Sequence, residues 1–307
     1  IPKLANIIRL IFNCYWRNSS KSLQILSSMI SNLDHLIIAV KNLDEAENNY
    51  QKIFGMPPVW RGEHENLGTK NSIFNFENTY CELLSANGEG IGAELINDII
   101  NKKGEGLIGF AFGSDDIDKT SKALKEAGFN ISGALNGTGI SNETNKIRKW
   151  KNLFLPQELT RGIFSFIIQH LSGSIPKHQS YPKESIHKLD HVVINTNDAD
   201  GFIDIYKDIF NIRLALDKVI EHWNSRMLFF RLNKTTIEVI EKKDEKKSSD
   251  NLWGLAWEVS SISDTHQRLI KEGVEVSPIN VGIKEGTLVA TIKSHTHNVP
   301  TLLIQHQ

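Results

Sequence analysis

Two histidine–glutamate pairs stand out as residues that could do chemistry. His35 lies 47 residues before Glu82 (82 − 35), and His191 lies 47 residues before Glu238 (238 − 191). Both members of the first pair therefore recur 156 residues later (191 − 35 and 238 − 82). Their surroundings recur with them: LDHLIIAV returns as LDHVVINT, and YCELLS returns as TIEVIE. Charged residues inside apolar strands are costly unless they have a partner. The repeat therefore indicates a duplicated site.

The strand pattern around each pair indicates what the two residues could do together. Alternation along a strand places His35 and Ile37 on one face. In the same way, Glu82 shares a face with Tyr80 and Leu84. If both strands line one cup, an imidazole and a carboxylate converge, which suits a divalent cation such as zinc, iron or manganese. A buried hydrogen-bonded pair without a metal would place them in the same way, and both interpretations stay open.

The elements that must position these residues follow a repeated order. A strand at 33–40 precedes the helical pattern LDEAENNYQKIF, which Gly55 ends. Three short strands complete this unit, and a looser copy of it starts at residue 106. A polar segment with Pro176 and Pro182 follows, and then the whole arrangement returns. We therefore predict an α+β fold of four βαβββ modules in two tandem pairs, each pair forming a cupped mixed sheet with the helices outside.

The same pattern sets the expected domain boundaries. The chain up to Leu33 holds four basic residues and no acidic one, so residues 1–28 could be an organelle transit peptide. An appendage to a cytoplasmic protein is the interpretation we favour. The predicted parts are an N-terminal appendage or leader at 1–31, a first domain at 32–170, a linker at 171–187 and a second domain at 188–307.

Composition narrows the class of protein. The net charge is −1 and the basic residues are dispersed, which argues against a nucleic-acid partner. The apolar stretch LANIIRLIFNCYW is short and interrupted by Arg9, so we expect no membrane span. Cys14 and Cys81 lack metal-type spacing, which is typical of a reducing compartment. We expect a small-molecule substrate or ligand as the partner, and a monomer or homodimer as the assembly.

Beyond these patterns, the LDH strand, the ELL strand and the paired units resemble the vicinal oxygen chelate superfamily of glyoxalases, bleomycin-resistance proteins and extradiol dioxygenases. The segment GTKNSIFNFENTYCELLS at 68–85 is most similar to its glyoxalase-like branch. The resemblance covers residues 32–307. Its motifs are moderately specific for the fold and weakly specific for the reaction.

The resemblance implies metal ligands on the first and last strands of each module. Gly109 and Gly254 occupy positions where a ligating histidine is usual, so each half is one ligand short of the common pattern. Glutamine is a weak neutral ligand, so the expected affinity is reduced. The implied cofactor is a divalent metal: zinc, iron, manganese or nickel. The implied ligands are His35, Glu82 and Gln169 in the first half, and His191, Glu238 and Gln305 in the second.

Several residues could hold a substrate beside the first pair. The connection at 60–71 should lie at the mouth of the cup, where a basic side chain would suit a carboxylate, an enolate or a phosphate. An ordinary solvated hairpin is the other interpretation of this segment. Trp150, between two lysines, either faces the cup or belongs to the core. The substrate-binding candidates are Arg61, His64, Asn71 and Trp150, and Lys70 is a candidate for steadying negative charge.

The resemblance implies two functions. One is a metal-dependent isomerase or lyase in which the cation polarises a carbonyl and an enolate is stabilised, with Glu82 as ligand and possible base, His35 as ligand and Lys70 beside them. The other is a metal-free protein of the bleomycin-resistance kind that sequesters a small molecule; the glycines favour it. Ring-cleaving dioxygenase chemistry is disfavoured because it needs two histidines and one carboxylate.

Overall fold

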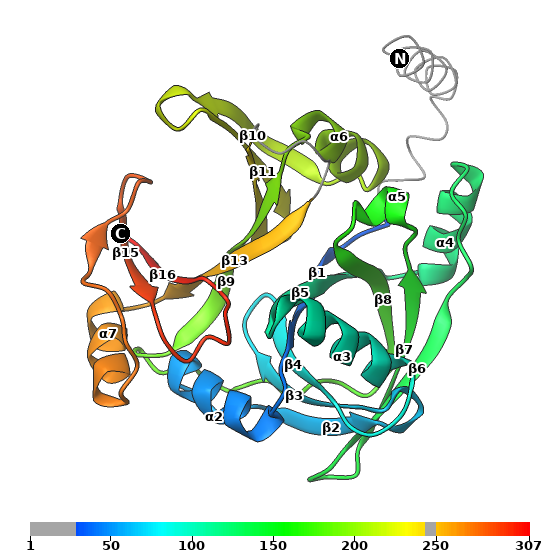
Figure 1. Cartoon of the computed structure of the whole chain (residues 1–307), viewed down its shortest axis with the longest axis horizontal. Helices are drawn as coiled ribbons and strands as arrows, with labels where there is room; N and C mark the ends of the chain where they lie inside the picture. Colours follow the sequence, from blue (N-terminus) through cyan, green and yellow to red (C-terminus); the bar gives the residue numbers. More distant parts are fainter. Residues whose placement is uncertain (1–28, 243–249) are drawn as a thin grey trace.

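The computed structural model describes residues 29–242 and 250–307, and it places two eight-stranded sheets beside each other (Figure 1). Each sheet is built from two βαβββ modules. In every module the first and last strands pair in parallel, as β1 with β4, β5 with β8, β9 with β12 and β13 with β16. The predicted α+β fold of four modules in two tandem pairs is therefore confirmed. The expectations for residues 1–28 lie outside the described residues.

The first sheet closes into a barrel, here called the first barrel, in the order β1-β4-β3-β2-β6-β7-β8-β5. Closure occurs where Gly62 of β2 pairs with Ser141 of β6. A Cβ atom at Gly62 would lie 2.6 Å from the Ile140 carbonyl oxygen, so glycine permits this approach. The elements of this half are β1 (Asn32–Ala39), α2 (Leu43–Phe54), β2 (Trp60–His64), a 3-10 turn (Glu65–Leu67), β3 (Thr69–Asn75), β4 (Tyr80–Ala86), α3 (Ile91–Lys103), β5 (Gly106–Gly113), α4 (Ile117–Glu126), β6 (Leu135–Ser141), β7 (Ile147–Phe154), α5 (Gln157–Thr160) and β8 (Phe164–Ser172).

The second sheet stays open, in the order β10-β11-β12-β9-β13-β16-β15-β14. Its terminal strands β10 and β14 are the counterparts of β2 and β6, and β14 is only two residues long. The two halves therefore differ in shape, because the first sheet is closed and the second is open (Figure 1). The elements of this half are β9 (Ile186–Thr196), α6 (Ala199–Ile203), a π-helical turn (Asp204–Ile209), β10 (Arg213–Ile220), a 3-10 turn (Glu221–Trp223), β11 (Ser225–Leu232), β12 (Thr235–Glu241), β13 (Asn251–Val259), α7 (Ile262–Lys271), β14 (Asn280–Val281), β15 (Thr287–Ile292) and β16 (Thr301–His306).

Local signals fix the helix ends. The Asn42 side chain accepts hydrogen bonds from two backbone amides at the start of α2, and Gly55 ends that helix with a φ of 74°. This left-handed conformation is the reason for glycine there. The buried side of α2 includes Tyr50 and Phe54, as the helical spacing predicts.

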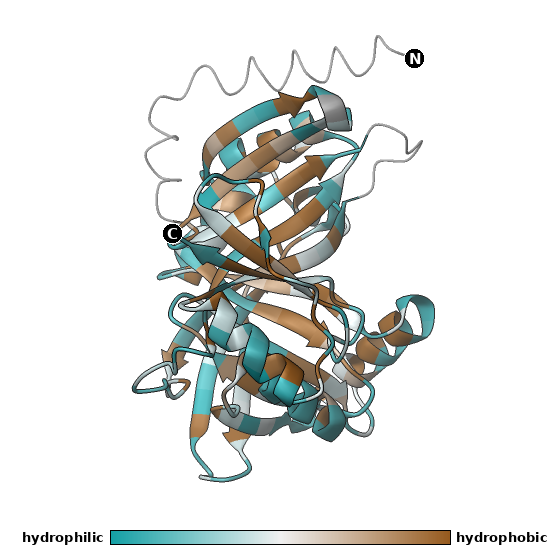
Figure 2. Ribbon diagram, turned by 90° about the vertical axis from the view of Figure 1, so that its left-hand side faces the viewer, coloured by the Kyte–Doolittle hydropathy of each residue, from teal (hydrophilic) through white to brown (hydrophobic). Residues whose placement is uncertain are grey.

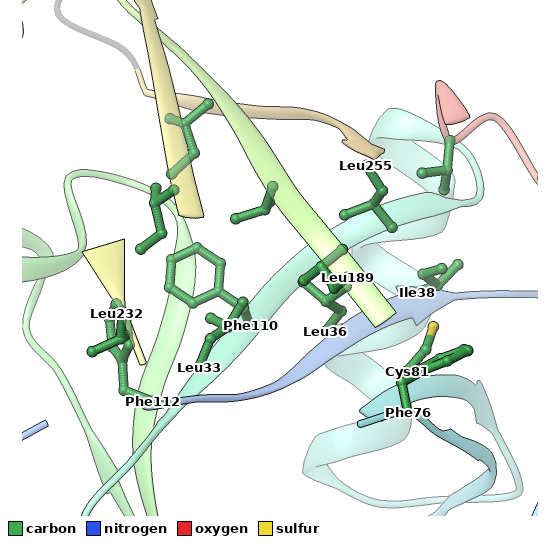
Figure 3. Close-up of a cluster of buried hydrophobic side chains, with 14 of the residues drawn as sticks. Leu33, Leu36, Ile38, Phe76, Cys81, Phe110, Phe112, Leu189, Leu232 and Leu255 are labelled. Atoms are coloured by element: carbon green, nitrogen blue, oxygen red, sulfur yellow. The ribbon is translucent and has the colours of Figure 1, made fainter. Parts of the chain in front are cut away.

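One hydrophobic core joins the two halves. Leu36 and Phe110 of the first barrel lie in the same cluster as Leu189 and Leu255 of the second sheet (Figure 3). The strands of both halves carry bands of hydrophobic and hydrophilic residues (Figure 2). Because the apolar outer faces of the sheets pack against helices and against each other, the opposite faces remain to line the barrel and the open sheet. No helix among the described residues is long and apolar enough to cross a membrane.

Helix α3 is the longest helix that the sequence analysis did not anticipate. Its buried residues Ile96 and Ile100 pack against Ala39 and against Leu84 and Ile108. Ala39 and Leu84 continue the inner faces of β1 and β4. Helix α3 therefore lies over one end of the first barrel, as the view in Figure 1 shows.

Candidate metal centre

The first histidine–glutamate pair lies inside the first barrel. His35 and Glu82 are both buried, and His35 Nε2 lies 3.6 Å from Glu82 Oε2. Their strands are parallel neighbours, with Ile37 paired to Glu82 in the register. Ile37 packs against Trp150 and Phe166 from the far side of the barrel, which identifies this face as the inner one. The predicted convergence of imidazole and carboxylate is present in this geometry.

Asp34 contacts the nitrogen of the His35 imidazole that does not face Glu82. Its Oδ1 lies 2.7 Å from His35 Nδ1, and its Oδ2 lies 3.0 Å from Nε2 of His170 on β8. Burial alone would raise the pKa of Asp34, but the hydrogen bonds to His170 and His35 hold that pKa well below its usual value. The ionised carboxylate can only accept, so His35 Nδ1 carries a proton and Nε2 faces Glu82.

The second half repeats this arrangement atom for atom. Asp190 Oδ1 lies 2.7 Å from His191 Nδ1, and Asp190 Oδ2 lies 2.6 Å from Nε2 of His306. His191 Nε2 lies 3.3 Å from Glu238 Oε2. The pKa of Asp190 is lowered by its two histidine partners despite burial, and burial raises the pKa of Glu238. Each half thus contains a His–Asp–His–Glu chain, of which the sequence analysis found only the last two members.

The two pairs fit a divalent cation as partial sites. A nitrogen and an oxygen bound to one tetrahedral zinc ion are about 3.3–3.5 Å apart, given bond lengths near 2.0–2.2 Å. The distances of 3.6 and 3.3 Å are close to that spacing. A carboxylate behind the ligating histidine is also the usual support of a metal-bound imidazole, because it fixes the tautomer that leaves Nε2 free.

Both glutamines lie away from these pairs. Gln169 Oε1 accepts a hydrogen bond from the Ile117 amide at 3.1 Å, and its Nε2 donates to the Asp115 carbonyl. Gln305 Oε1 accepts in the same way from the Ile262 amide at 2.7 Å. The two side chains therefore cap α4 and α7 on the outer face. The structure does not bring either glutamine to the histidine and glutamate that it was expected to join.

The positions of the two glycines cannot take a side chain without a backbone shift. A Cβ atom at Gly109 would lie 2.2 Å from the Phe164 carbonyl oxygen, and one at Gly254 would lie 2.6 Å from the Pro300 carbonyl oxygen. The close approach of a neighbouring backbone explains glycine at both places.

One group of three potential ligands occurs in the described residues, and it belongs to the second half. It consists of Asp190, Glu258 and His306, whose ligand atoms lie within 4.8 Å of one another. Lys188 Nζ already lies 2.6 Å from Glu258 Oε2, so a cation would compete with this ammonium group. Within the described part of the chain, no third His, Cys, Asp or Glu forms a three-ligand group with either histidine–glutamate pair.

Three of the expected substrate-binding residues lie inside the first barrel. Asn71 Nδ2 donates to Glu82 Oε1 at 2.6 Å, and Asn71 Oδ1 is buried without a partner. The ring of His64 lies 5.7 Å from the ring of Trp150 in an edge contact. Burial lowers the pKa of His64, which favours the neutral imidazole. His64, Asn71 and Trp150 are thus gathered around Glu82.

The two basic candidates lie on the outer face instead. Arg61 pairs with Asp44 and Glu47 of α2. Lys70 precedes the inward-facing Asn71 on β3, so it points toward the same outer side. Neither is placed to steady negative charge beside His35.

Sequence reasoning missed a different cation in the barrel. Arg148 on β7 is only 5% exposed, and its guanidinium lies 5.3 Å from the ring of Trp60 and 5.6 Å from that of Trp150. The signal was its spacing of two from Trp150, which places both side chains on one face. Asp34 and Asp190 carried a signal as well, since each precedes its histidine in an LDH triplet.

Two protein-family models match this sequence. The family model described as "Glyoxalase-like domain" matches residues 33–210, and the family model described as "Glyoxalase/Bleomycin resistance protein/Dioxygenase superfamily" matches residues 190–291. The matches confirm the resemblance found in the sequence. No curated protein sequence matches the chain.

Solved structures share the fold at low identity. A mutant of 4-hydroxymandelate synthase from Streptomyces coelicolor is 14% identical with a TM-score of 0.64, over 91% of this chain and 93% of that chain. The Mn(II)-bound glyoxalase from Novosphingobium aromaticivorans is 14% identical with a TM-score of 0.59, over 91% and 83%. A hypothetical protein from Staphylococcus aureus is 13% identical with a TM-score of 0.61, over 89% and 99%. At these identities the likeness concerns the fold alone.

Proposed function

Since this chain belongs to the glyoxalase-like domain family, we propose that it is a divalent-metal-dependent lyase or isomerase acting on a small substrate with neighbouring oxygen atoms. The observation that carries the proposal is the His–Asp–His–Glu chain, built twice with an imidazole nitrogen 3.6 or 3.3 Å from a carboxylate oxygen. Two lone-pair donors facing each other at this distance need either a proton or a cation between them.

In the first barrel, His35 Nε2 and Glu82 Oε2 would hold the metal. When bound, a divalent cation polarises a substrate carbonyl and favours loss of the neighbouring proton. Asp34 keeps the imidazole of His35 in one orientation, and Asn71 fixes the second oxygen of Glu82. The buried aromatic side chains Trp150 and Phe166 line the same interior, and an apolar lining strengthens the electrostatic interactions of these groups.

We assign the reaction to the first barrel rather than to the second sheet. The residues 156 positions after His64 and Asn71 are Ile220 and Met227, so the polar surroundings of the pair are not duplicated (64 + 156 and 71 + 156). The second pair keeps its ligands but is flanked by apolar residues there. We propose a metal-binding or structural role for it.

A metal-free binding protein of the bleomycin-resistance kind is the second candidate. The observation that favours it is that no third His, Cys, Asp or Glu among the described residues forms a three-ligand group with either pair. In that case a proton on His35 Nε2 would join the imidazole to Glu82.

Metal content separates the two candidates. The protein is purified without chelator, reconstituted with zinc, manganese, iron or nickel, and measured by inductively coupled plasma mass spectrometry for wild type, His35→Ala and His191→Ala. We expect one bound ion fewer in each variant, and no change in the matched control His178→Ala, which alters a linker histidine. Wild type that takes up no metal under any of these conditions would overturn the enzyme proposal and leave the binding protein.

A further inference from the structure

Arg148 is a buried cation without a direct ion pair. It is 95% shielded from solvent, and among residues 29–242 and 250–307 it forms no ion pair. Its Nε has no hydrogen-bond partner. A buried guanidinium that no carboxylate contacts directly keeps little of its hydration, so a ligand that brings a negative charge to it would stabilise it.

The groups around Arg148 form a built site rather than an accidental gap. Trp60 and Trp150 flank the guanidinium, and Tyr80 lies close enough for the guanidinium to act on its hydroxyl group electrostatically. Glycines make room for both indoles: a Cβ atom at Gly137 would lie 2.2 Å from Trp150 Nε1, and one at Gly62 would lie 2.6 Å from Trp60 Nε1. The strands are therefore adapted to keep two flat apolar surfaces beside one positive charge.

We propose that the first barrel binds the carboxylate group of a small organic acid, and that Arg148 is the residue that holds it. A planar guanidinium pairs with a carboxylate through two parallel hydrogen bonds, so the ligand would supply both the missing charge and the missing acceptor. The indoles of Trp60 and Trp150 then favour a flat or apolar remainder. A small organic acid would be the substrate class of the function proposed above. It depends on that function only because both are placed in the first barrel.

The opposite end of such a ligand would find a polar partner as well. Asn71 Oδ1 is buried and unpartnered, while Asn71 Nδ2 is bound to Glu82. A ligand hydroxyl could donate to this oxygen. A hydroxy acid therefore matches the unpartnered donor of Arg148 and the unpartnered acceptor of Asn71 at the same time.

Matched pairs of ligands test the charge requirement. The hydroxy acids glycolate and lactate, and the aromatic acids benzoate and phenylacetate, are each compared with the corresponding neutral amide by isothermal titration calorimetry and by the shift in melting temperature. We expect at least one acid to bind wild type and to raise its melting temperature, and its amide to bind about 30-fold more weakly or worse. Equal binding of every acid and its amide, or no acid binding at all, would overturn the proposal.

Two variants locate the effect at Arg148. Arg148→Met should lose the preference for the acid while melting at or above the wild-type temperature, because a buried unpaired charge is removed. The control Lys149→Met removes the same charge from the exposed neighbouring position and should bind like wild type. Unchanged selectivity in Arg148→Met would overturn the assignment. The titrations are carried out on metal-free and on metal-loaded protein. The proposal of a carboxylate ligand can then fail independently of the metal proposal, which fails only if no ion binds.

Discussion

His306 Nε2 lies 2.6 Å from Oδ2 of Asp190, and this contact reproduces in the second half the one between His170 and Asp34 in the first. In both halves an aspartate is thus held between the last strand of one module and the histidine of another. Each aspartate links two strands through its hydrogen bonds and fixes the orientation of an imidazole. The ionisation of the aspartates should therefore affect both stability and metal binding.

Acid should weaken the fold through Asp34 and Asp190. Both have folded-state pKa values below the usual value, so their stabilisation is fully present above pH ~4, where the unfolded carboxyls are ionised, and is lost as the pH falls below it. Urea unfolding between pH 3 and 7 measures the free energy of unfolding. We expect a shallower decline in Asp34→Asn/Asp190→Asn; a decline as steep as in wild type would contradict this role.

The same aspartates should tune metal affinity. Asp34→Asn retains the size of the side chain but weakens the hold on the tautomer and basicity of His35, so affinity at the first site should fall about 10- to 100-fold. Competition with a chromogenic chelator measures it. The exposed variant Asp118→Asn serves as control, and equal affinities in both variants would show that Asp34 has no such role.

Replacing Gln169 should affect stability and leave metal uptake unchanged. Gln169→Ala removes the acceptor for the Ile117 amide at the start of α4, which should cost about 1–2 kcal/mol of unfolding free energy. Chemical unfolding and metal analysis are carried out on the same samples. Gln157→Ala, at an exposed site, is the control, and loss of metal from Gln169→Ala would restore Gln169 as a ligand.

Arg161 should be important for the joint between the halves. It donates to the buried carboxylate of Asp250 through Nη2 at 3.1 Å and to the Asp198 carbonyl at 3.2 Å, both in the second half. Arg161→Met leaves a buried carboxylate without its cation and should cost about 3–5 kcal/mol in urea unfolding. Arg161→Met/Asp250→Asn should recover part of the loss. A single variant as stable as wild type would argue against this contribution.

Cys81 should be unreactive in the folded protein. Its side chain is fully buried, and burial raises the pKa of the thiol far above its usual value. In a Cys14→Ser background, a thiol-exchange reagent such as dithionitrobenzoate should release colour only after urea is added. Rapid labelling without denaturant would show that β4 opens readily.

The sequence by itself determined the modules and the first part of the site. Repeats, strand alternation and helix ends are local properties, so they predicted the four βαβββ units, the helix between Asn42 and Gly55, and the shared face of His35 and Ile37. The same local information placed His64, Asn71 and Trp150 among the candidates near Glu82. The sequence analysis placed His64 and Asn71 in a connection at the mouth of the cup, whereas they lie on β2 and β3, and it left Trp150 open between cup and core.

The tertiary structure decided which face of the remaining strands turned inward and which sheet closed. Ile167 and Ile168 are both buried because β8 is covered on its two sides, so no polar face marked the direction of Gln169, and its amide turned to α4. Arg148 was hidden for a related reason, since a basic residue is normally expected in water. When a strand is buried on both faces, the face toward which each side chain points depends on contacts with segments that are distant in the sequence. Those contacts exist only once the chain has folded.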